Sequence, residues 1–140
     1  MLPALFPRPD ASLLTLRPSV ETEPAPADAP ANAGDFLHTT LRPVLKLQNA
    51  LLLAVVADFV LDHHMALAKA SAVDQQRQLA ELLSRNTKLR YTLLGLISGQ
   101  FTSEEYAFYR QQRPELNRRI LELAQRRVLG QTSQVVALLD

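Results

Sequence analysis

Four polar residues near the middle of the chain have the types and spacing of metal ligands. Asp58 and Asp62 are four residues apart, so both would project from one face of a helix, and His63 and His64 follow directly. Carboxylate and imidazole groups suit iron, manganese or zinc. A di-metal site in a helical bundle usually takes acidic ligands from all four helices and two Glu-x-x-His pairs, and the sequence has no such pair. We therefore expect no metal here, and a helical metal-binding protein is the third of three functional alternatives.

Basic residues interleaved with aromatic ones form a second candidate site. Between Arg77 and Arg127 ten Lys and Arg residues stand against five Glu, and cationic and aromatic side chains together commonly bind single-stranded nucleic acid. Glu precedes Arg by four residues three times, a spacing that favours pairing within a helix, at Glu81–Arg85, Glu115–Arg119 and Glu122–Arg126. The candidates for a nucleic-acid patch are Lys88, Arg90, Arg110, Arg113, Arg118 and Arg127. A small basic RNA- or ribosome-associated protein is the second alternative.

Signals for catalysis and for cofactor binding are missing from the sequence. There is no cysteine to serve as a nucleophile, thiolate ligand or disulfide partner. The four glycines have neither the spacing of a phosphate-binding loop nor that of a nucleophile elbow. The net charge of +1 gives no strong field that would attract nucleic acid or an anionic membrane. We expect no enzymatic activity and no cofactor.

The first 34 residues have the composition of a disordered tail. Seven of the nine prolines lie before residue 31, and residues 21–34 are rich in Ala and Pro, which favours extended chain. Two short apolar segments interrupt this tail, and their candidate partner-binding residues are Leu5, Phe6, Leu13, Leu14 and Leu16. These segments are either incidental apolar residues in a flexible terminus or docking segments that become ordered on a protein partner or on the helical bundle of their own chain, and we expect a protein partner to bind them. We also expect deletion of residues 1–34 to leave the stability of the remaining chain nearly unchanged.

Residues 40–69 are predicted to form one long helix. Its middle, residues 50–57, is apolar on every side, so it must be surrounded by protein. The wider run over residues 44–61 is long enough to raise the question of a membrane span. Lys46 and Asp58 argue against one, because such a charge near the bilayer centre costs about 2.5–3.5 kcal/mol. We expect a cytoplasmic protein that makes no contact with a membrane.

Leucines spaced by three and four residues predict a second helix over residues 73–98. Asn86 is the one polar residue in this apolar seam, so the sequence leaves a break at that position open. The first and second helices have similar lengths, as an antiparallel hairpin requires. This hairpin would bring Asp58 level with Arg85 or Asn86. Because a carboxylate within an apolar helix needs a partner, we expect Asp58 to pair with one of them.

A capping box predicts a short third helix over residues 103–112. In the stretch from Phe101 to Tyr106, Thr102 and Glu105 have the types and spacing that satisfy backbone N–H groups at a helix start. Phe101 is expected to pack on Tyr106 as a hydrophobic staple.

The expected fold is all-α, a mostly antiparallel four-helix bundle over residues 35–130 that consists of a long hairpin and two shorter helices. Pro114 and Gly130 begin and end the fourth helix, and residues 131–140 follow as a short apolar segment. The first helix would span about 40 Å and the third only about 15 Å, so part of the apolar first helix would lack cover. This favours a homo-oligomer or a protein partner. The first alternative is therefore a non-enzymatic protein-interaction module, acting as an adaptor, an assembly factor or a regulatory factor.

Overall fold

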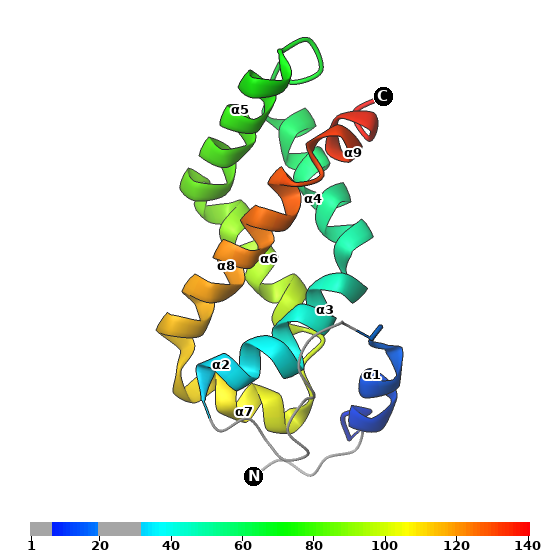
Figure 1. The fold of residues 1–140 in the computed structure, drawn as a ribbon, viewed down its shortest axis with the longest axis vertical. Coiled ribbons are helices and arrows are strands. Elements are labelled where there is room, and N and C mark those ends of the chain that lie inside the picture. Colours follow the sequence, from blue (N-terminus) through cyan, green and yellow to red (C-terminus); the bar gives the residue numbers. More distant parts are fainter. Residues whose placement is uncertain (1–6, 20–31) are drawn as a thin grey trace.

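Every regular element that the structure describes is a helix, as expected (Figure 1). A computed structural model of the chain describes residues 7–19 and 32–140. The α-helices are α1 (Asp10–Leu16), α2 (Ala33–Phe36), α3 (Arg42–Leu47), α4 (Asn49–Asp62), α5 (Ala72–Arg85), α6 (Thr87–Ser98), α7 (Ser103–Gln111), α8 (Arg113–Leu129) and α9 (Thr132–Ala137). A π-helical turn, η1 (Leu37–Leu41), joins α2 to α3.

The long first helix predicted over residues 40–69 is wrong in both its limits and its shape. Helical structure begins at Ala33, after Asn32 caps α2 by accepting a hydrogen bond from the Asp35 backbone N–H at 2.9 Å, and it ends at Asp62. The π-helical turn η1 lies just before Pro43, whose ring clashes with a regular α-helical carbonyl four residues earlier.

A bend of 63° separates the segment Ala33–Leu47 from α4. Gln48 lies at the bend, and its side-chain amide donates to the carbonyl of Leu96 in α6 at 3.0 Å. Asn49 begins α4 and donates to the side chain of Gln131 at 2.9 Å. Gln48 and Asn49 therefore both bind to other parts of the chain, and these hydrogen bonds stabilise the bend.

The second predicted helix is broken at Asn86 into α5 and α6. The Asn86 backbone is extended, with φ −80° and ψ 104°, and its side-chain oxygen accepts from the backbone N–H of Leu89 at 2.9 Å. Arg90 then donates to the carbonyl of Leu83 at 3.1 Å, near the end of α5. Because both long helices are interrupted, the expected hairpin of two straight helices does not form.

Replacing Asn86 by alanine is expected to lower the free energy of unfolding by about 1 kcal/mol, the usual loss when a helix N-cap is removed. Chemical denaturation monitored by circular dichroism measures this change. Ser84→Ala is the control, because Ser84 is exposed near the end of α5, close to Asn86 in the chain, and does not cap a helix start. Equal losses in the two variants would contradict a capping role for Asn86.

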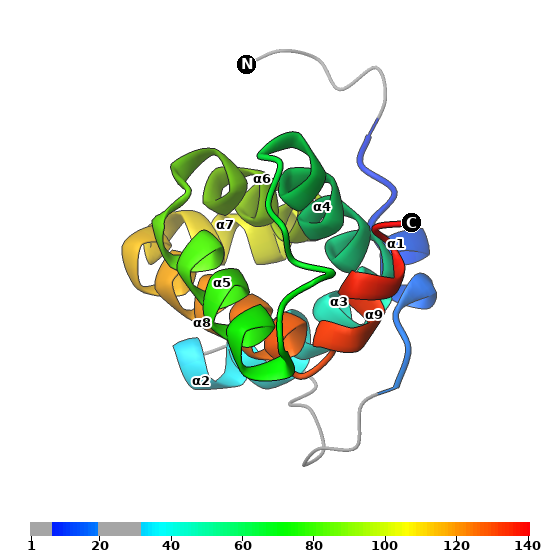
Figure 2. The ribbon, with the colours of Figure 1, turned by 90° about the horizontal axis from the view of Figure 1, so that it is seen from above.

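The core lies between α4, α6 and α8, and α9 packs against α4 (Figure 2). The fully buried side chains include Leu52, Val56 and Val60 of α4, Leu89 and Ile97 of α6, and Leu116, Ile120 and Val128 of α8. Val135 of α9 is also fully buried. Part of the apolar C-terminal segment is therefore an element of the core.

The capping box at the start of α7 is confirmed, but the staple is not. Thr102 accepts from the backbone N–H of Glu105 at 3.2 Å, and the Glu105 side chain accepts from the backbone N–H of Thr102 at 2.8 Å. Phe101 packs edge-on against Phe36 and Tyr109, with ring centroids 5.3 and 5.5 Å apart. Its expected partner, Tyr106, is partly exposed.

No single helix within residues 7–19 and 32–140 is long and apolar enough to cross a membrane. The bent pair Ala33–Leu47 and Asn49–Asp62 meets the criteria of length and composition only when its two parts are taken together.

Candidate docking surface

Residues 7–19, which were expected to be part of a disordered tail, form an ordered segment in the structure. This segment contains α1, which lies beside α3 in both views (Figures 1 and 2). Arg8 donates to the carbonyls of Phe101 and Gly99, each at 2.7 Å. Asp10 accepts from the backbone N–H of Ser103 at 3.0 Å and from its hydroxyl at 3.3 Å. Charged side chains thus attach the start of α1 to the connection between α6 and α7.

A buried ion pair attaches the other end of α1. The two terminal nitrogens of Arg17 donate to the two carboxylate oxygens of Glu105 at 2.7 and 2.6 Å, and one of them also donates to the carbonyl of Gln100 at 2.8 Å. The side chains of Arg17 and Glu105 are only 6% and 11% exposed. A bidentate arginine–carboxylate pair of this kind has stronger hydrogen bonds and a more defined orientation than a single contact.

The local sequence explains how Arg17 reaches Glu105. Pro18 disfavours the helical conformation for the residue before it, so α1 ends at Leu16 and the Arg17 backbone is extended, with φ −75° and ψ 130°. Lys46 of α3 donates to the carbonyl of Ser19 at 3.0 Å, which holds the chain just beyond this turn.

Glu105 accepts hydrogen bonds from three different parts of the chain. Besides Arg17 and the Thr102 backbone, the hydroxyl of Thr40 in η1 donates to it at 2.7 Å. Burial by itself raises the pKa of the Glu105 carboxyl, but the hydrogen bonds from Arg17, Thr102 and Thr40 outweigh this effect and hold the pKa below its ordinary value. Glu105 is therefore a carboxylate at neutral pH, and it joins α1, η1 and α7.

Two of the three leucines of α1 are exposed to solvent. No residue of α1 is fully buried, Leu14 is 52% exposed and Leu16 is 60% exposed, while Leu13 is half-buried. The usual arrangement is therefore reversed, since the segment buries a charged residue and exposes apolar ones. The other two candidate partner-binding residues, Leu5 and Phe6, lie outside the described residues.

A second exposed apolar surface lies on α4. Leu51 and Leu61 are about half exposed, although the opposite face of the same helix is fully buried in the core. The sequence predicted that part of this helix would lack cover, and the exposed residues of α4 include these two leucines.

The four candidate metal ligands do not form a metal site. Among the residues that the structure describes, no three His, Asp or Glu side chains are grouped so that they could hold a metal ion. Asp58, Asp62, His63 and His64 are all exposed. The expected pairing of Asp58 with Arg85 or Asn86 is also wrong, because α4 turns Asp58 toward solvent and Arg85 lies 3.6 Å from Glu81.

The two histidines lie at the C-terminus of α4, as expected. Nδ1 of His63 lies 2.8 Å from the carbonyl oxygen of Phe59, and its ring stacks on the Phe59 ring with centroids 5.9 Å apart. Nδ1 must therefore donate, which leaves Nε2 to accept from the Asn86 side chain at 3.3 Å. His64 has a positive φ of 53° and ends the helix. His63 thus binds the break between α5 and α6.

Replacing Asp58 by alanine is expected to change the free energy of unfolding by less than about 0.5 kcal/mol, because its side chain is exposed on the surface of α4. Urea denaturation of the two proteins measures the difference. A loss several times larger would show that Asp58 has a buried partner after all.

The six candidate residues for a nucleic-acid patch lie on α6, α7 and α8, and several of them have partners within the chain. Arg90 binds a carbonyl within the α5–α6 connection, Arg113 lies 5.6 Å from the centre of the Tyr109 ring, and Arg118 pairs with Glu122 at 2.8 Å. Arg127 is half-buried, whereas Lys88 and Arg110 are exposed on α6 and α7.

Two of the three predicted pairs within helices are confirmed, at 3.6 Å each, for Glu81–Arg85 and Glu115–Arg119. The third is wrong, because Glu122 pairs with Arg118, one turn earlier, and not with Arg126. Arg126 has no carboxylate partner among the described residues and lines a groove between α3 and α8.

Sequence reasoning missed the buried ion pair of Arg17 and Glu105. Two local signals bear on this pair, the proline after Arg17 and the place of Glu105 in a capping box. The capping box already gave the Glu105 carboxylate a hydrogen-bond donor, so the sequence did not call for a second partner. A search of protein-family models, of curated protein sequences and of solved structures found no match to this chain, so the assignment of a function depends on the geometry of these surfaces.

Proposed function

We propose that this chain is a non-enzymatic protein-interaction module that presents the leucines of α1 to a protein partner. The observation that carries the proposal is the reversed arrangement of α1, in which Arg17 is buried against Glu105 while Leu14 and Leu16 are exposed. An adaptor, an assembly factor or a regulatory factor would use such a surface.

Attachment to the rest of the chain prepares α1 for binding. An isolated helix of seven residues is unstable in water, because helix nucleation is costly. Here Arg8, Asp10 and Arg17 supply contacts from both ends. A partner therefore meets leucines that are already ordered, and binding loses less conformational entropy than it would with a free peptide.

The exposed leucines of α4 give the partner a second place to bind. Full burial of one leucine side chain contributes about 1.5–3 kcal/mol, so the two leucines of α1 alone would give a weak complex. Leu51 and Leu61 would add to the apolar contact. The partner is either another protein or a second copy of this chain.

The test compares the natural chain with the double variant Leu14→Glu and Leu16→Glu. The control is Val73→Glu with Tyr91→Glu, which places the same charges at apolar positions of α5 and α6 that are 77% and 70% exposed. Circular dichroism checks that each protein is folded. Analytical ultracentrifugation then measures self-association, and quantitative co-purification from the native host measures association with other proteins.

We expect one defined association that the α1 variant loses and the control retains. If the natural chain self-associates and only the α1 variant is monomeric, the partner is a second copy. If both variants associate as the natural chain does, the α1 leucines are not the docking surface and the proposal fails.

A further inference from the structure

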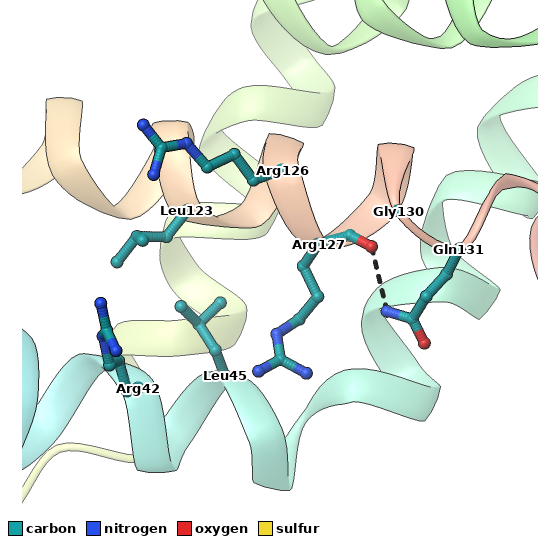
Figure 3. A pocket seen from close by; sticks show the side chains of 7 residues that line it. All are labelled: Arg42, Leu45, Leu123, Arg126, Arg127, Gly130 and Gln131. Atoms are coloured by element: carbon teal, nitrogen blue, oxygen red, sulfur yellow. Dashed lines mark hydrogen bonds between the residues drawn. The ribbon is translucent and has the colours of Figure 1, made fainter. Parts of the chain in front are cut away.

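A groove on another part of the molecule combines three arginines with an apolar centre. It lies between α3 and α8 and has a volume of about 370 Å³ (Figure 3). Its lining residues are Arg42, Leu45, Leu123, Arg126, Arg127, Gly130 and Gln131.

None of the three arginines forms an ion pair with a carboxylate of the described residues. Five other arginines do so, and they are Arg17, Arg77, Arg85, Arg118 and Arg119. The contrast is clearest on α8, where Glu122 pairs with Arg118 and leaves Arg126 at the groove. A bound anion would supply the counter-charge that the described part of the chain does not provide for these guanidinium groups.

Hydrogen bonds hold one side of the groove in a fixed geometry. The side-chain oxygen of Asn49 accepts from Arg127 at 3.2 Å and from Gln131 at 2.8 Å, while its amide donates back to Gln131 at 2.9 Å. Gln131 also donates to the carbonyl of Arg127 at 3.0 Å (Figure 3). Burial lowers the pKa of the Arg127 guanidinium from its ordinary value, but an arginine remains charged at neutral pH. The site is thus partly organised before any ligand binds.

The positions of the guanidinium groups indicate the shape of the ligand. In the close view, the guanidinium groups of Arg42 and Arg126 lie on different sides of Leu123, and that of Arg127 lies beyond Leu45 (Figure 3). The cations therefore surround two leucines and do not converge on one point. A single small anion would contact only part of such a site, whereas an extended chain of anionic groups attached to an apolar or planar body could contact more than one arginine and the leucines together.

We propose that this groove binds a small organic polyanion in which a chain of two or more phosphate groups is attached to an apolar or planar body. Guanidinium groups bind phosphate through paired hydrogen bonds, and Leu45 and Leu123 would contact the uncharged part of the ligand. The volume falls within the range of sites that bind small molecules. ATP is the probe that we would use to represent this class.

Isothermal titration calorimetry of the full chain in low-salt buffer tests the proposal with ATP, pyrophosphate and adenosine. We expect ATP to bind, pyrophosphate to bind more weakly and adenosine to show no binding. Arg42→Gln and Arg126→Gln are each expected to weaken ATP binding about tenfold, the usual effect of losing one strong charged hydrogen bond. Arg85→Gln is the matched control, because it removes the same charge from the exposed surface of α5 and should leave ATP binding unchanged.

Three results would overturn the proposal. They are no binding of ATP at low salt, equal weakening by Arg85→Gln and by the groove variants, and binding of single-stranded RNA by a protein that does not bind ATP. The second would indicate general attraction to a basic protein, and the third would indicate a nucleic-acid surface. Circular dichroism of each variant shows whether a loss of binding reflects a loss of fold.

Discussion

Replacing Phe101 by alanine is expected to lower the free energy of unfolding by about 3–5 kcal/mol, among the largest losses for a single substitution in this chain. Its ring is fully buried and packs edge-on against Phe36 of α2 and Tyr109 of α7. Removing the ring would leave a cavity between α2 and α7. Urea denaturation at neutral pH, followed by circular dichroism, measures the loss.

Tyr106→Ala is the control for this prediction. The sequence assigned Tyr106 as the partner of Phe101, but its ring is partly exposed in the structure. Its replacement should cost about 1 kcal/mol, the common size of a loss at a partly exposed position. Equal and large losses in the two variants would support a staple between Phe101 and Tyr106. They would contradict the packing of Phe101 on Phe36 and Tyr109.

Replacing Glu105 by glutamine is expected to lower the free energy of unfolding by about 3 kcal/mol, because Arg17 would keep a buried charge without its partner. Glutamine has nearly the same size, so little packing is lost. Glu104→Gln is the matched control, since Glu104 is the exposed neighbour in the same first turn of α7 and should cost less than about 0.5 kcal/mol.

The same ion pair predicts how stability depends on pH. The pKa of Glu105 is lower in the folded chain than its ordinary value of 4.5, so the unfolded chain takes up a proton first as the pH falls. The contribution of Glu105 is fully present above pH 4.5 and is lost as the pH falls through the lower pKa of the folded state. Melting temperatures measured across this range should fall less steeply for Glu105→Gln than for the natural chain. Parallel curves would show that the pair is not formed.

These contacts reverse one expectation from the sequence. Deletion of residues 1–34 was expected to leave stability nearly unchanged. The deletion would leave Glu105 without its partner Arg17. It would also remove the first residues of α2, which begins at Ala33. We now expect this deletion to destabilise the chain.

Signals that act within one turn of helix were sufficient to predict much of the fold. The capping box of Thr102 and Glu105 lies where the sequence placed it, because its hydrogen bonds join residues only three apart. The end of α8 before Gly130 was predicted for a similar reason. An all-helical chain follows from periodicity alone.

Contacts between distant residues could not be predicted in this way. Gln48 and Asn86 are polar interruptions of apolar runs, but their consequences depend on Leu96 and His63, which lie 48 and 23 residues away. The sequence shows that a polar group is present and does not show which neighbour will accept or donate. The candidate metal residues failed for the same reason, since all four lie at the C-terminal end of α4 or directly after it and, among the described residues, no other helix adds a ligand.

The span of chain between Arg17 and Glu105 has a consequence for synthesis on the ribosome. The two residues are 88 positions apart, and α1 is made long before its binding site. At a synthesis rate of about 5–20 residues per second, roughly 4–18 s pass between the two residues. During that interval Arg17 has no Glu105 to pair with, and the leucines of α1 are accessible to any chaperone or partner that meets the growing chain. Such an early encounter would compete with the attachment of α1 to its own protein.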